Sequence, residues 1–302
     1  MKELNNQSLQ QNFMIGDQWL YYKIYTGVKT GDAVLTKIIK PVVIKLLKKK
    51  IIDKWFFIRY SDPDFHIRVR FRCLSPENIA QIINGLFDPL KSYLELDLIW
   101  KVQLDTYQRE LKRYGMNTID LSETIFYHDS EMAVNLLDLL DEEEGEELRW
   151  LFAIKAIDSF LDLFCPSIEL KQQQVNYLKM NFDKEFGMNK PLTKQMNDKF
   201  RVYRKKIESF MELDEINAGE LLPLIDLLMQ NQTIIKSCAE RLLEIEKKGN
   251  LQVPLPNLIG SYLHMQLNRL FKSKNRLHEM VCYNLLYRYY HSKIGRKVHS
   301  LK

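Results

Sequence analysis

The sequence predicts an α+β fold, in which a small four-stranded antiparallel ferredoxin-like sheet near the N-terminus is followed by a larger all-helical half. Three observations predict it. Strand-like segments end near residue 106, two helical segments lie between them, and from about Ile119 onward apolar residues recur at three-to-four spacing. Strand, helix, strand, strand, helix, strand is the ferredoxin-like order. We therefore expect a sheet-containing subdomain at residues 1–115, packed together with a helical subdomain at residues 116–302.

The first strand and helix are predicted near the start of the chain. Residues 1–15 are polar and are expected to be loose. The segment Trp19–Tyr25 reads as a strand, in which two sets of side chains point to opposite faces. The sets are Trp19, Tyr21, Lys23 and Tyr25 on one face and Leu20, Tyr22 and Ile24 on the other. Asp32 is then expected to cap a helix that runs to about Lys50. Because proline lacks a backbone N–H, a break or kink is expected at Pro41 within this helix.

The stretch Trp55–Cys73 reads WFFIRYSDPDFHIRVRFRC and predicts two strands joined by a turn at Ser61–Asp64. Alternation in the second strand puts apolar residues on one face and His66, Arg68, Arg70 and Arg72 on the other. Guanidinium groups about 7 Å apart on one face repel one another unless anions or carboxylates lie over them. This face is either a solvated strand surface or a site for an anion.

The remaining elements complete the pattern. A helix is predicted from Ser75–Glu77 to about Leu94, and a last strand at Leu98–Thr106. Two helices then cover the apolar face of the sheet, and the arginines belong to its free face. Asp141–Glu147 is expected to be a solvated acidic link. The predicted helices of the second half are residues 119–141, 146–164, 167–184, 192–212, 219–248, 255–272 and 275–294.

Composition excludes several classes of protein. The charge of +5 comes from 44 basic and 39 acidic residues, so charge gives no indication of nucleic acid binding. No apolar run reaches the roughly 18 residues that span a bilayer, and the start lacks a secretory signal, so a soluble cytoplasmic protein is expected. The histidines show no metal-ligand spacing. The cysteines are expected to be reduced, buried thiols: Cys73, Cys165, Cys238 and Cys282.

Three further residues are candidates for chemistry. Arg109 directly follows the last strand, and Arg113 comes four residues later; either can be a structural arginine paired with Glu110 or Asp105. His264 flanks the apolar stripe of its helix, where a hydrogen-bonded histidine at the edge of the core is the ordinary interpretation. Histidine is also the usual proton carrier at neutral pH.

Four motifs, in order, span nearly the whole chain, and a fifth, FYHDSE, is weaker. The four motifs are WLYYKIYTG near the start, WFFIRYSDPDFHIRVRF, YQRELKRYG at Tyr107–Gly115 and HMQLNRLF at His264–Phe271. With them the sequence resembles the C-terminal domain of class I lantibiotic dehydratases and the related thiopeptide-type bacteriocin biosynthesis proteins.

The resemblance implies a free-standing glutamate-elimination protein. In the family, a long N-terminal domain uses glutamyl-tRNA to glutamylate Ser and Thr of a ribosomal precursor peptide, and the C-terminal domain then eliminates glutamate. The implied partners are that peptide and a separate tRNA-dependent glutamylating protein, with no direct nucleic acid contact and no cofactor or metal. The implied catalytic residues are Arg68, Arg70, Arg109 and His264. We further expect substrate contacts from Arg59, His66, Arg113 and Asn268.

The chemistry of elimination suits these residue types. Guanidinium groups bind carboxylates bidentately and stabilise charge that develops on a carbonyl oxygen. The resemblance leaves open whether His264 acts as base or acid. It also leaves two alternatives: the pyridine-forming [4+2] cycloaddition of thiopeptide biosynthesis, whose branch does not keep the elimination arginines, and a non-catalytic subunit that binds a peptide or partner. We expect Arg68, Arg70, Arg109 and His264 to line one cleft.

Overall fold

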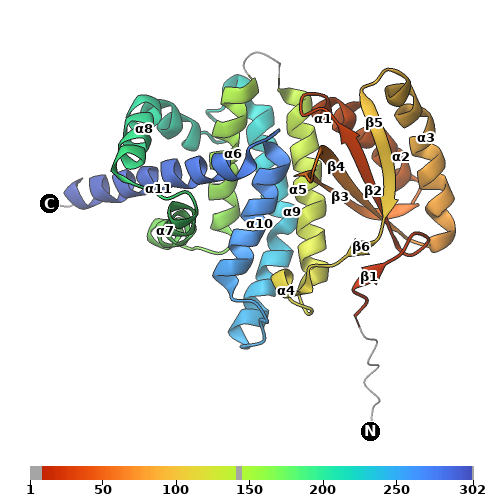
Figure 1. The fold of residues 1–302 in the computed structure, drawn as a ribbon. Helices are drawn as coiled ribbons and strands as arrows, with labels where there is room; N and C mark the ends of the chain where they lie inside the picture. The colour runs from red at the N-terminus through yellow and green to blue at the C-terminus, as the bar shows by residue number, and fades with distance from the viewer. Residues whose placement is uncertain (1–8, 141–144, 301–302) are drawn as a thin grey trace, which may run out of the picture. The chain divides into compact units, whose positions relative to one another are not determined.

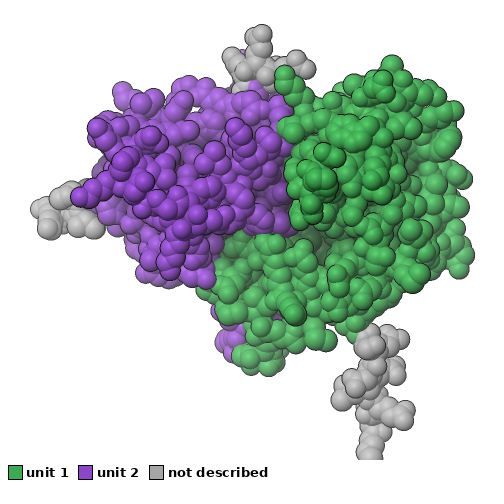
Figure 2. Space-filling model, in the orientation of Figure 1, with its two compact units in different colours: residues 1–127, 248–261 green, residues 128–247, 262–302 purple. Residues whose placement is uncertain are grey.

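The computed structural model describes residues 9–140 and 145–300, with side chains to residue 297. The fold is α+β, and the second half of the chain is mostly helical (Figure 1). The chain divides into two compact units (Figure 2): unit 1 holds residues 1–127 and 248–261, and unit 2 holds residues 128–247 and 262–302. The expected boundary between residues 115 and 116 stays a prediction about domain organisation.

The main sheet of unit 1 has the four antiparallel strands that the sequence predicts. Its strand order is β3-β4-β2-β5, and every neighbouring pair is antiparallel. Each strand begins and ends within a few residues of its predicted bounds. The strands are β2 (Trp19–Thr26), β3 (Ile52–Ser61), β4 (Phe65–Cys73) and β5 (Ile99–Asp105).

One face of this sheet is buried beneath helices. The first helical segment runs through α1 (Thr30–Ala33), a π-helical turn (Val34–Ile39) and α2 (Lys40–Lys48). The second is a 3₁₀ turn (Pro76–Asn78) followed by α3 (Ile79–Glu95). Helix α2 packs on β3 and α3 packs on β5 (Figure 1). Ile67, Val69 and Phe71 of β4 have no exposed surface on this side.

The cap predicted at Asp32 is wrong, and of the break or kink predicted at Pro41 the break is absent while the kink stays a prediction. The helix begins at Thr30, so Asp32 lies inside its first turn and binds Arg59 instead of capping the helix. The helix also continues past Pro41 without a break. Pro41 lies in the first turn of α2, directly after the π-helical turn. A missing N–H is tolerated there because the wider turn has already shifted the hydrogen-bond pattern.

The register of the strands sets which side chains share the opposite face. Arg70 pairs with Tyr21 of β2 and Phe56 of β3, and Arg68 pairs with Lys23 and Ile58. Directly paired residues of an antiparallel sheet point to the same side. We call this side the arginine face; its residues are Trp19, Tyr21, Lys23, Tyr25, Lys54, Phe56, Ile58, Tyr60, His66, Arg68, Arg70 and Arg72.

A second, two-stranded sheet was not predicted. β1 (Asn12–Phe13) pairs with β6 (Tyr107–Gln108), so the expectation that residues 1–15 are loose is wrong for this pair of residues. Residues 1–8 lie outside the described part of the chain. The ring of Phe13 is buried and stacks on Tyr107 at 5.8 Å between centroids. Apolar burial therefore orders a segment whose composition is otherwise polar.

The predicted helices of the second half are all present. Residues 141–144 of the expected acidic link lie outside the described residues. In unit 2, α11 packs against α6, α7 and α8. The bounds are α4 (Leu111–Tyr114), α5 (Ile119–Leu139), α6 (Gly145–Asp162), α7 (Ile168–Glu185), α8 (Lys190–Met211), a 3₁₀ turn (Gly219–Leu221), α9 (Leu222–Lys247), α10 (Leu255–Leu270) and α11 (Asn275–Ser300).

Two sequence-based expectations concern membranes and cysteines. Within residues 9–140 and 145–300, no helix has the length and apolar character needed to span a bilayer. The four cysteines are buried and form no disulfide, as predicted. Burial raises the pKa of the Cys73 thiol to about 11 and that of Cys282 to about 12. Both sulfurs are therefore protonated, unreactive core groups.

Candidate active site

Arg70 is a buried cation enclosed by aromatic rings. Its guanidinium carbon lies 4.3 Å from the ring centre of Tyr21, 4.9 Å from Tyr107 and 5.2 Å from Phe56. The residue is only 8% exposed, yet it makes no hydrogen bond or ion pair with any described residue, and its Nε is buried without a partner. Each cation–π contact contributes about 0.5–2 kcal/mol, whereas an unpaired buried charge costs several. This arrangement favours an anion as the missing partner.

Arg68 also forms no hydrogen bond or ion pair with a carboxylate of the described residues, although its charge acts on nearby Asp105. Its guanidinium carbon lies 3.5 Å above the ring of Tyr60, and its Nε donates to Nε2 of His66 at 3.0 Å. His66 Nδ1 in turn donates to the carbonyl oxygen of Asp64 at 2.9 Å. A carbonyl can only accept, so the proton of the neutral ring is on Nδ1. Burial, together with the nearby charge of Arg68, lowers the pKa of His66 and keeps its ring neutral. His66 therefore positions Arg68.

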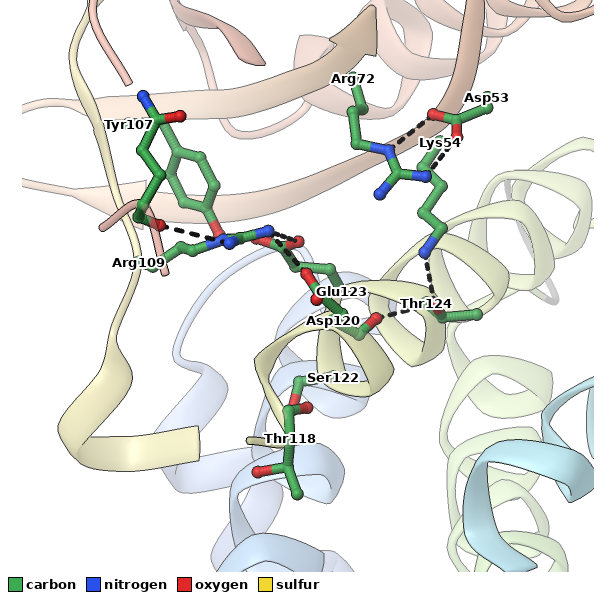
Figure 3. Close-up of polar contacts among 11 residues, drawn as sticks. Asp53, Lys54, Arg72, Tyr107, Arg109, Thr118, Asp120, Ser122, Glu123 and Thr124 are labelled. Atoms are coloured by element: carbon green, nitrogen blue, oxygen red, sulfur yellow. Dashed lines mark hydrogen bonds and ion pairs between the residues drawn. The ribbon is translucent and has the colours of Figure 1, made fainter. Parts of the chain in front are cut away.

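The neighbouring arginines of the sheet are neutralised by carboxylates. Arg72, on the same strand and face, forms an ion pair with Asp53 through two nitrogen atoms (Figure 3). Arg59 lies on the opposite, helix-covered face, because its partner in β4 is Ile67. It is 2% exposed and binds Asp32 at 2.6 Å. Because Arg59 faces away from Arg68 and Arg70, its position does not support a substrate contact shared by the three arginines.

Arg109 is held by two carboxylates of α5. Its Nε and Nη2 donate to the two oxygens of Glu123 at 2.8 and 2.7 Å, and Nη2 also donates to Asp120 at 2.8 Å (Figure 3). Glu123 has no exposed surface, and the hydroxyl of Tyr107 donates to it as well, at 2.9 Å. The partners suggested by the sequence, Glu110 and Asp105, are not the ones used. This is the environment of a structural arginine, and a catalytic role for Arg109 stays a prediction.

Arg113 lies in α4 and is about one-third exposed. Its Nη1 is 3.5 Å from Glu110, and its Nε donates to the hydroxyl of Ser261 at 3.2 Å. A weak, partly exposed ion pair of this kind holds a side chain loosely. Arg113 therefore keeps hydrogen-bonding capacity for a ligand, and its role in substrate binding stays a prediction.

His264, on α10 in unit 2, is oriented by a carboxylate. Its Nδ1 lies 2.8 Å from Oε2 of Glu279 on α11, and its side chain is 20% exposed. Asn268 follows one turn later on α10 and is also partly exposed. Its carbonyl oxygen accepts a hydrogen bond from Asn275 at 2.9 Å. A histidine fixed at one nitrogen and partly open to solvent is suited to exchange a proton at the other.

The structure brings several predicted site residues together within unit 1. Arg68, Arg70 and His66 share the arginine face, and Tyr107 links Arg70 to the carboxylate that holds Arg109. His264 and Asn268 belong to unit 2. Convergence of the histidine with the arginines therefore stays a prediction. Within the described residues, no group of three metal-ligating side chains is placed to hold a metal ion.

Besides the α5 carboxylates that hold Arg109, sequence reasoning missed Tyr21, Phe56 and Glu279. Tyr21 and Phe56 flank Arg70 only because of the strand register, which the sequence does not reveal. Alternation along β2 did offer a signal for Tyr21, since it shares a face with Lys23. No sequence pattern indicates that Glu279 is the partner of His264, because the two residues lie fifteen positions apart in different helices.

Comparison with known proteins places the chain in a family. A family described as the lantibiotic biosynthesis dehydratase C-terminus matches residues 19–290. The nisin biosynthesis protein NisB of Lactococcus lactis subsp. lactis is 24% identical over 272 residues, which cover 89% of this chain and 25% of NisB. The chain thus spans about a quarter of the length of this relative.

Two solved structures have a similar fold. The tRNA-dependent lantibiotic dehydratase MibB from Microbispora sp. 107891 aligns with a TM-score of 0.68 and 21% identity, over 93% of this chain and 29% of MibB. TbtD, the pyridine synthase from thiomuracin biosynthesis, aligns with a TM-score of 0.66 and 11% identity, over 89% of this chain and 97% of TbtD. At these identities the likeness concerns the fold alone. The match of the family over residues 19–290 is decisive, and the chain belongs to the lantibiotic biosynthesis dehydratase C-terminal family.

Proposed function

We propose that this protein eliminates glutamate from glutamylated Ser or Thr residues of a ribosomal precursor peptide, giving dehydroalanine or dehydrobutyrine. The observation that carries the proposal is Arg70, a buried guanidinium to which the described part of the chain offers aromatic rings but no bonded anion. A glutamyl ester brings a carboxylate, and its elimination releases a second one. Family membership supports the reaction class, and the proposal places the reaction in the cytoplasm, where the peptide is made.

In this proposal Arg70 and Arg68 bind the anionic parts of the substrate. Removal of the α-proton builds negative charge on the carbonyl oxygen, and a preorganised guanidinium stabilises that charge most where water is excluded. Arg70 meets this requirement because three rings shield it. Arg68 is more exposed and is aimed by His66, which suits it to hold the carboxylate of the leaving glutamate. Arg109 supports the rings around Arg70 through Tyr107 and Glu123.

His264 moves the proton. Electrons from the broken Cα–H bond form the Cα–Cβ double bond, the Cβ–O bond breaks, and glutamate leaves as a carboxylate. The proposed partners are a precursor peptide already glutamylated and a tRNA-dependent glutamylating protein, since the proposed reaction starts from the glutamyl ester. We also propose a ferredoxin-like arrangement for unit 1, which is supported by the strand order β3-β4-β2-β5.

The test uses the purified protein, a precursor peptide glutamylated on one Ser, and mass spectrometry. The wild type is expected to release glutamate and leave a peptide one water lighter than its unmodified form. Arg70→Ala removes the buried donor, so the rate is expected to fall about 100- to 1,000-fold. Arg70→Lys keeps the charge without the planar fork and is expected to restore little. His264→Ala is expected to leave the glutamyl ester intact.

Arg72→Gln is the matched control, since Arg72 lies on the same strand and face but is already paired with Asp53. Its elimination rate is expected to stay within a few-fold of the wild type. If the wild type binds the glutamylated peptide and never releases glutamate, the protein is a binding subunit. If it consumes a peptide that carries two dehydroalanines and forms a pyridine ring, the cycloaddition assignment replaces this one.

A further inference from the structure

Glu279 is a buried carboxylate at the centre of a hydrogen-bond cluster in unit 2. It lies near the start of α11 and is 2% exposed. Its Oε2 accepts a hydrogen bond from Nδ1 of His264, at 2.8 Å. An ionised carboxylate can only accept, so this contact requires the hydrogen of the imidazole to be on Nδ1.

Two more donors fix the position of the Glu279 carboxylate. The hydroxyl of Tyr283 donates to Oε1 at 3.1 Å, and Nη1 of Arg276 donates to Oε2 at 3.1 Å. Burial raises the pKa of Tyr283, so its hydroxyl stays protonated. Arg276 is itself restrained by an ion pair with Glu185 and lies 4.1 Å above the ring of Phe182. Both carboxylate oxygens are in use, and rotation of the group would break at least two bonds.

The second ring nitrogen of His264, Nε2, has no hydrogen-bond partner among residues 9–140 and 145–297. With the hydrogen on Nδ1, the neutral ring carries its lone pair at Nε2. The side chain is 20% exposed, so a ligand can reach it. The geometry is that of a base held in one tautomer by a carboxylate, the arrangement in which the carboxylate also stabilises the imidazolium formed on protonation.

We propose that Glu279 is a positioning residue that holds His264 as the Nδ1–H tautomer, so that Nε2 is the atom that takes the α-proton. The inference rests on the proposed elimination and assigns His264 the role of base. As the Cα–H bond breaks, its proton forms a bond with Nε2, and the resulting imidazolium faces the negative charge of Glu279. The Cβ–O bond breaks, glutamate departs, and Nε2 returns the proton to water or to the departing carboxylate.

The first measurement is the tautomer of His264, followed by ¹⁵N NMR of protein labelled at histidine nitrogens. In the wild type at a pH where the ring is neutral, Nδ1 is expected to be the protonated nitrogen. Glu279→Leu removes the acceptor, so the hydrogen is expected to move to Nε2 or to be shared between the two nitrogens. If the Nδ1–H tautomer persists in Glu279→Leu, Glu279 does not position the ring and the proposal is wrong.

Glu279→Gln separates orientation from charge and keeps the shape of the side chain. Its amide oxygen can face His264 and Arg276, while its NH₂ can donate to Tyr283, whose hydroxyl is able to rotate and accept. The Nδ1–H tautomer is therefore expected to survive. The charge opposite the imidazolium is lost, and kcat is expected to fall about 10- to 100-fold while KM for the glutamylated peptide changes little. In Glu279→Leu the fall in kcat is expected to be about 100-fold or more.

The matched control is Glu208→Gln, which removes a carboxylate of unit 2 that binds Arg204 and Arg296 and has no part in the Glu279 cluster. It is expected to leave both the tautomer and kcat unchanged. An unchanged kcat in Glu279→Leu, with the tautomer shifted, overturns the role of Glu279 in the reaction. A wild type that shows the Nδ1–H tautomer but eliminates no glutamate refutes the proposed function and, with it, the assignment of His264 as base; the tautomer result still stands on its own.

Discussion

At the scale of single residues, Arg70 and Arg109 are equally buried but differ in what balances their charge. Arg109 is 6% exposed and carries two carboxylates, whereas Arg70 is 8% exposed and carries none among the described residues. A buried ion pair whose hydrogen bonds are satisfied holds a structure in one geometry. A buried cation without an anion is a cost that folding alone does not explain, and it is the reason for proposing a ligand at Arg70.

Arg109→Ala is expected to destabilise the protein by about 3–5 kcal/mol, because it leaves Glu123 buried without its partner. The free energy of unfolding, measured by urea denaturation, gives this value directly. The double variant Arg109→Leu with Glu123→Leu removes both charges and is expected to recover part of the loss. Arg70→Ala should show no comparable destabilisation. Equal losses for Arg70→Ala and Arg109→Ala would contradict the distinction between the two arginines.

At the scale of elements, one carboxylate in unit 2 connects residues of three helices. Asp129 of α5 is buried, and its Oδ1 accepts from Asn231 of α9 at 3.2 Å and from Gln266 of α10 at 3.3 Å. Burial raises the pKa of Asp129 from 3.8 to about 6, although Arg269 and both amides act in the opposite direction. The protonated form is therefore favoured in the folded protein far more than in the unfolded chain.

This shift has a definite sign for stability. An acid with a raised pKa in the folded state contributes stability that is complete below pH 4 and is lost as the pH rises through about 6. A rise of the Asp129 pKa from 3.8 to about 6 corresponds to about 3 kcal/mol. Asp129→Asn lacks this titration. The difference in unfolding free energy between wild type and variant is expected to change by about that amount between pH 4 and pH 7, measured by urea denaturation. Parallel pH curves would refute the assignment.

At the scale of the whole molecule, unit 1 is built from two distant parts of the chain. Residues 248–261 belong to it, although 120 residues of unit 2 precede them in the sequence. The backbone N–H of Met116 donates to the side chain of Gln252 at 2.6 Å, and Asn117 donates to the carbonyl of Asn250 at 2.8 Å. The turn that follows α4 is therefore held by residues near the start of α10.

Gln252→Ala tests this connection in the full-length chain. The variant removes the acceptor used by the Met116 N–H, and one hydrogen bond contributes about 0.5–1.5 kcal/mol. Exchange of the Met116 amide with deuterium is expected to become faster, by a factor on the order of ten at most. Amides of β4 serve as the internal reference, since their hydrogen bonds lie within the sheet. An unchanged exchange rate at Met116 would show that the contact is absent in solution.

Local patterns, the alternation within strands and the spacing of apolar residues within helices, predict these elements correctly. The alternation in His66–Cys73 predicts Arg68 and Arg70 on the face opposite α2 and α3, as observed, because strand geometry is local. That face is not free as expected, since Phe126 of α5 packs on Phe56 there. The helices after Ile119 were predicted within a few residues for the same reason. Pro41 misled the prediction, because the sequence does not show that a π-helical turn precedes it.

Contacts between distant segments were not predictable in this way. The partners of Arg109 were sought among its neighbours, Asp105 and Glu110, but the structure uses a carboxylate of the next long helix. A substrate contact is expected from Arg59, and only the register shows that it faces away from Arg68 and Arg70. The partners of Arg109 and the orientation of Arg59 depend on how elements pair and pack, which no local sequence pattern shows.

Strand β4 carries a constraint on how its gene can change. Guanidinium groups and apolar side chains alternate there one by one, with α2 and α3 on the apolar side. Substitutions can alter either set separately. Loss or gain of a single codon within the strand, however, would turn every following side chain over and drive arginines beneath the helices. The number of residues in this strand is thus constrained more strictly than their identities.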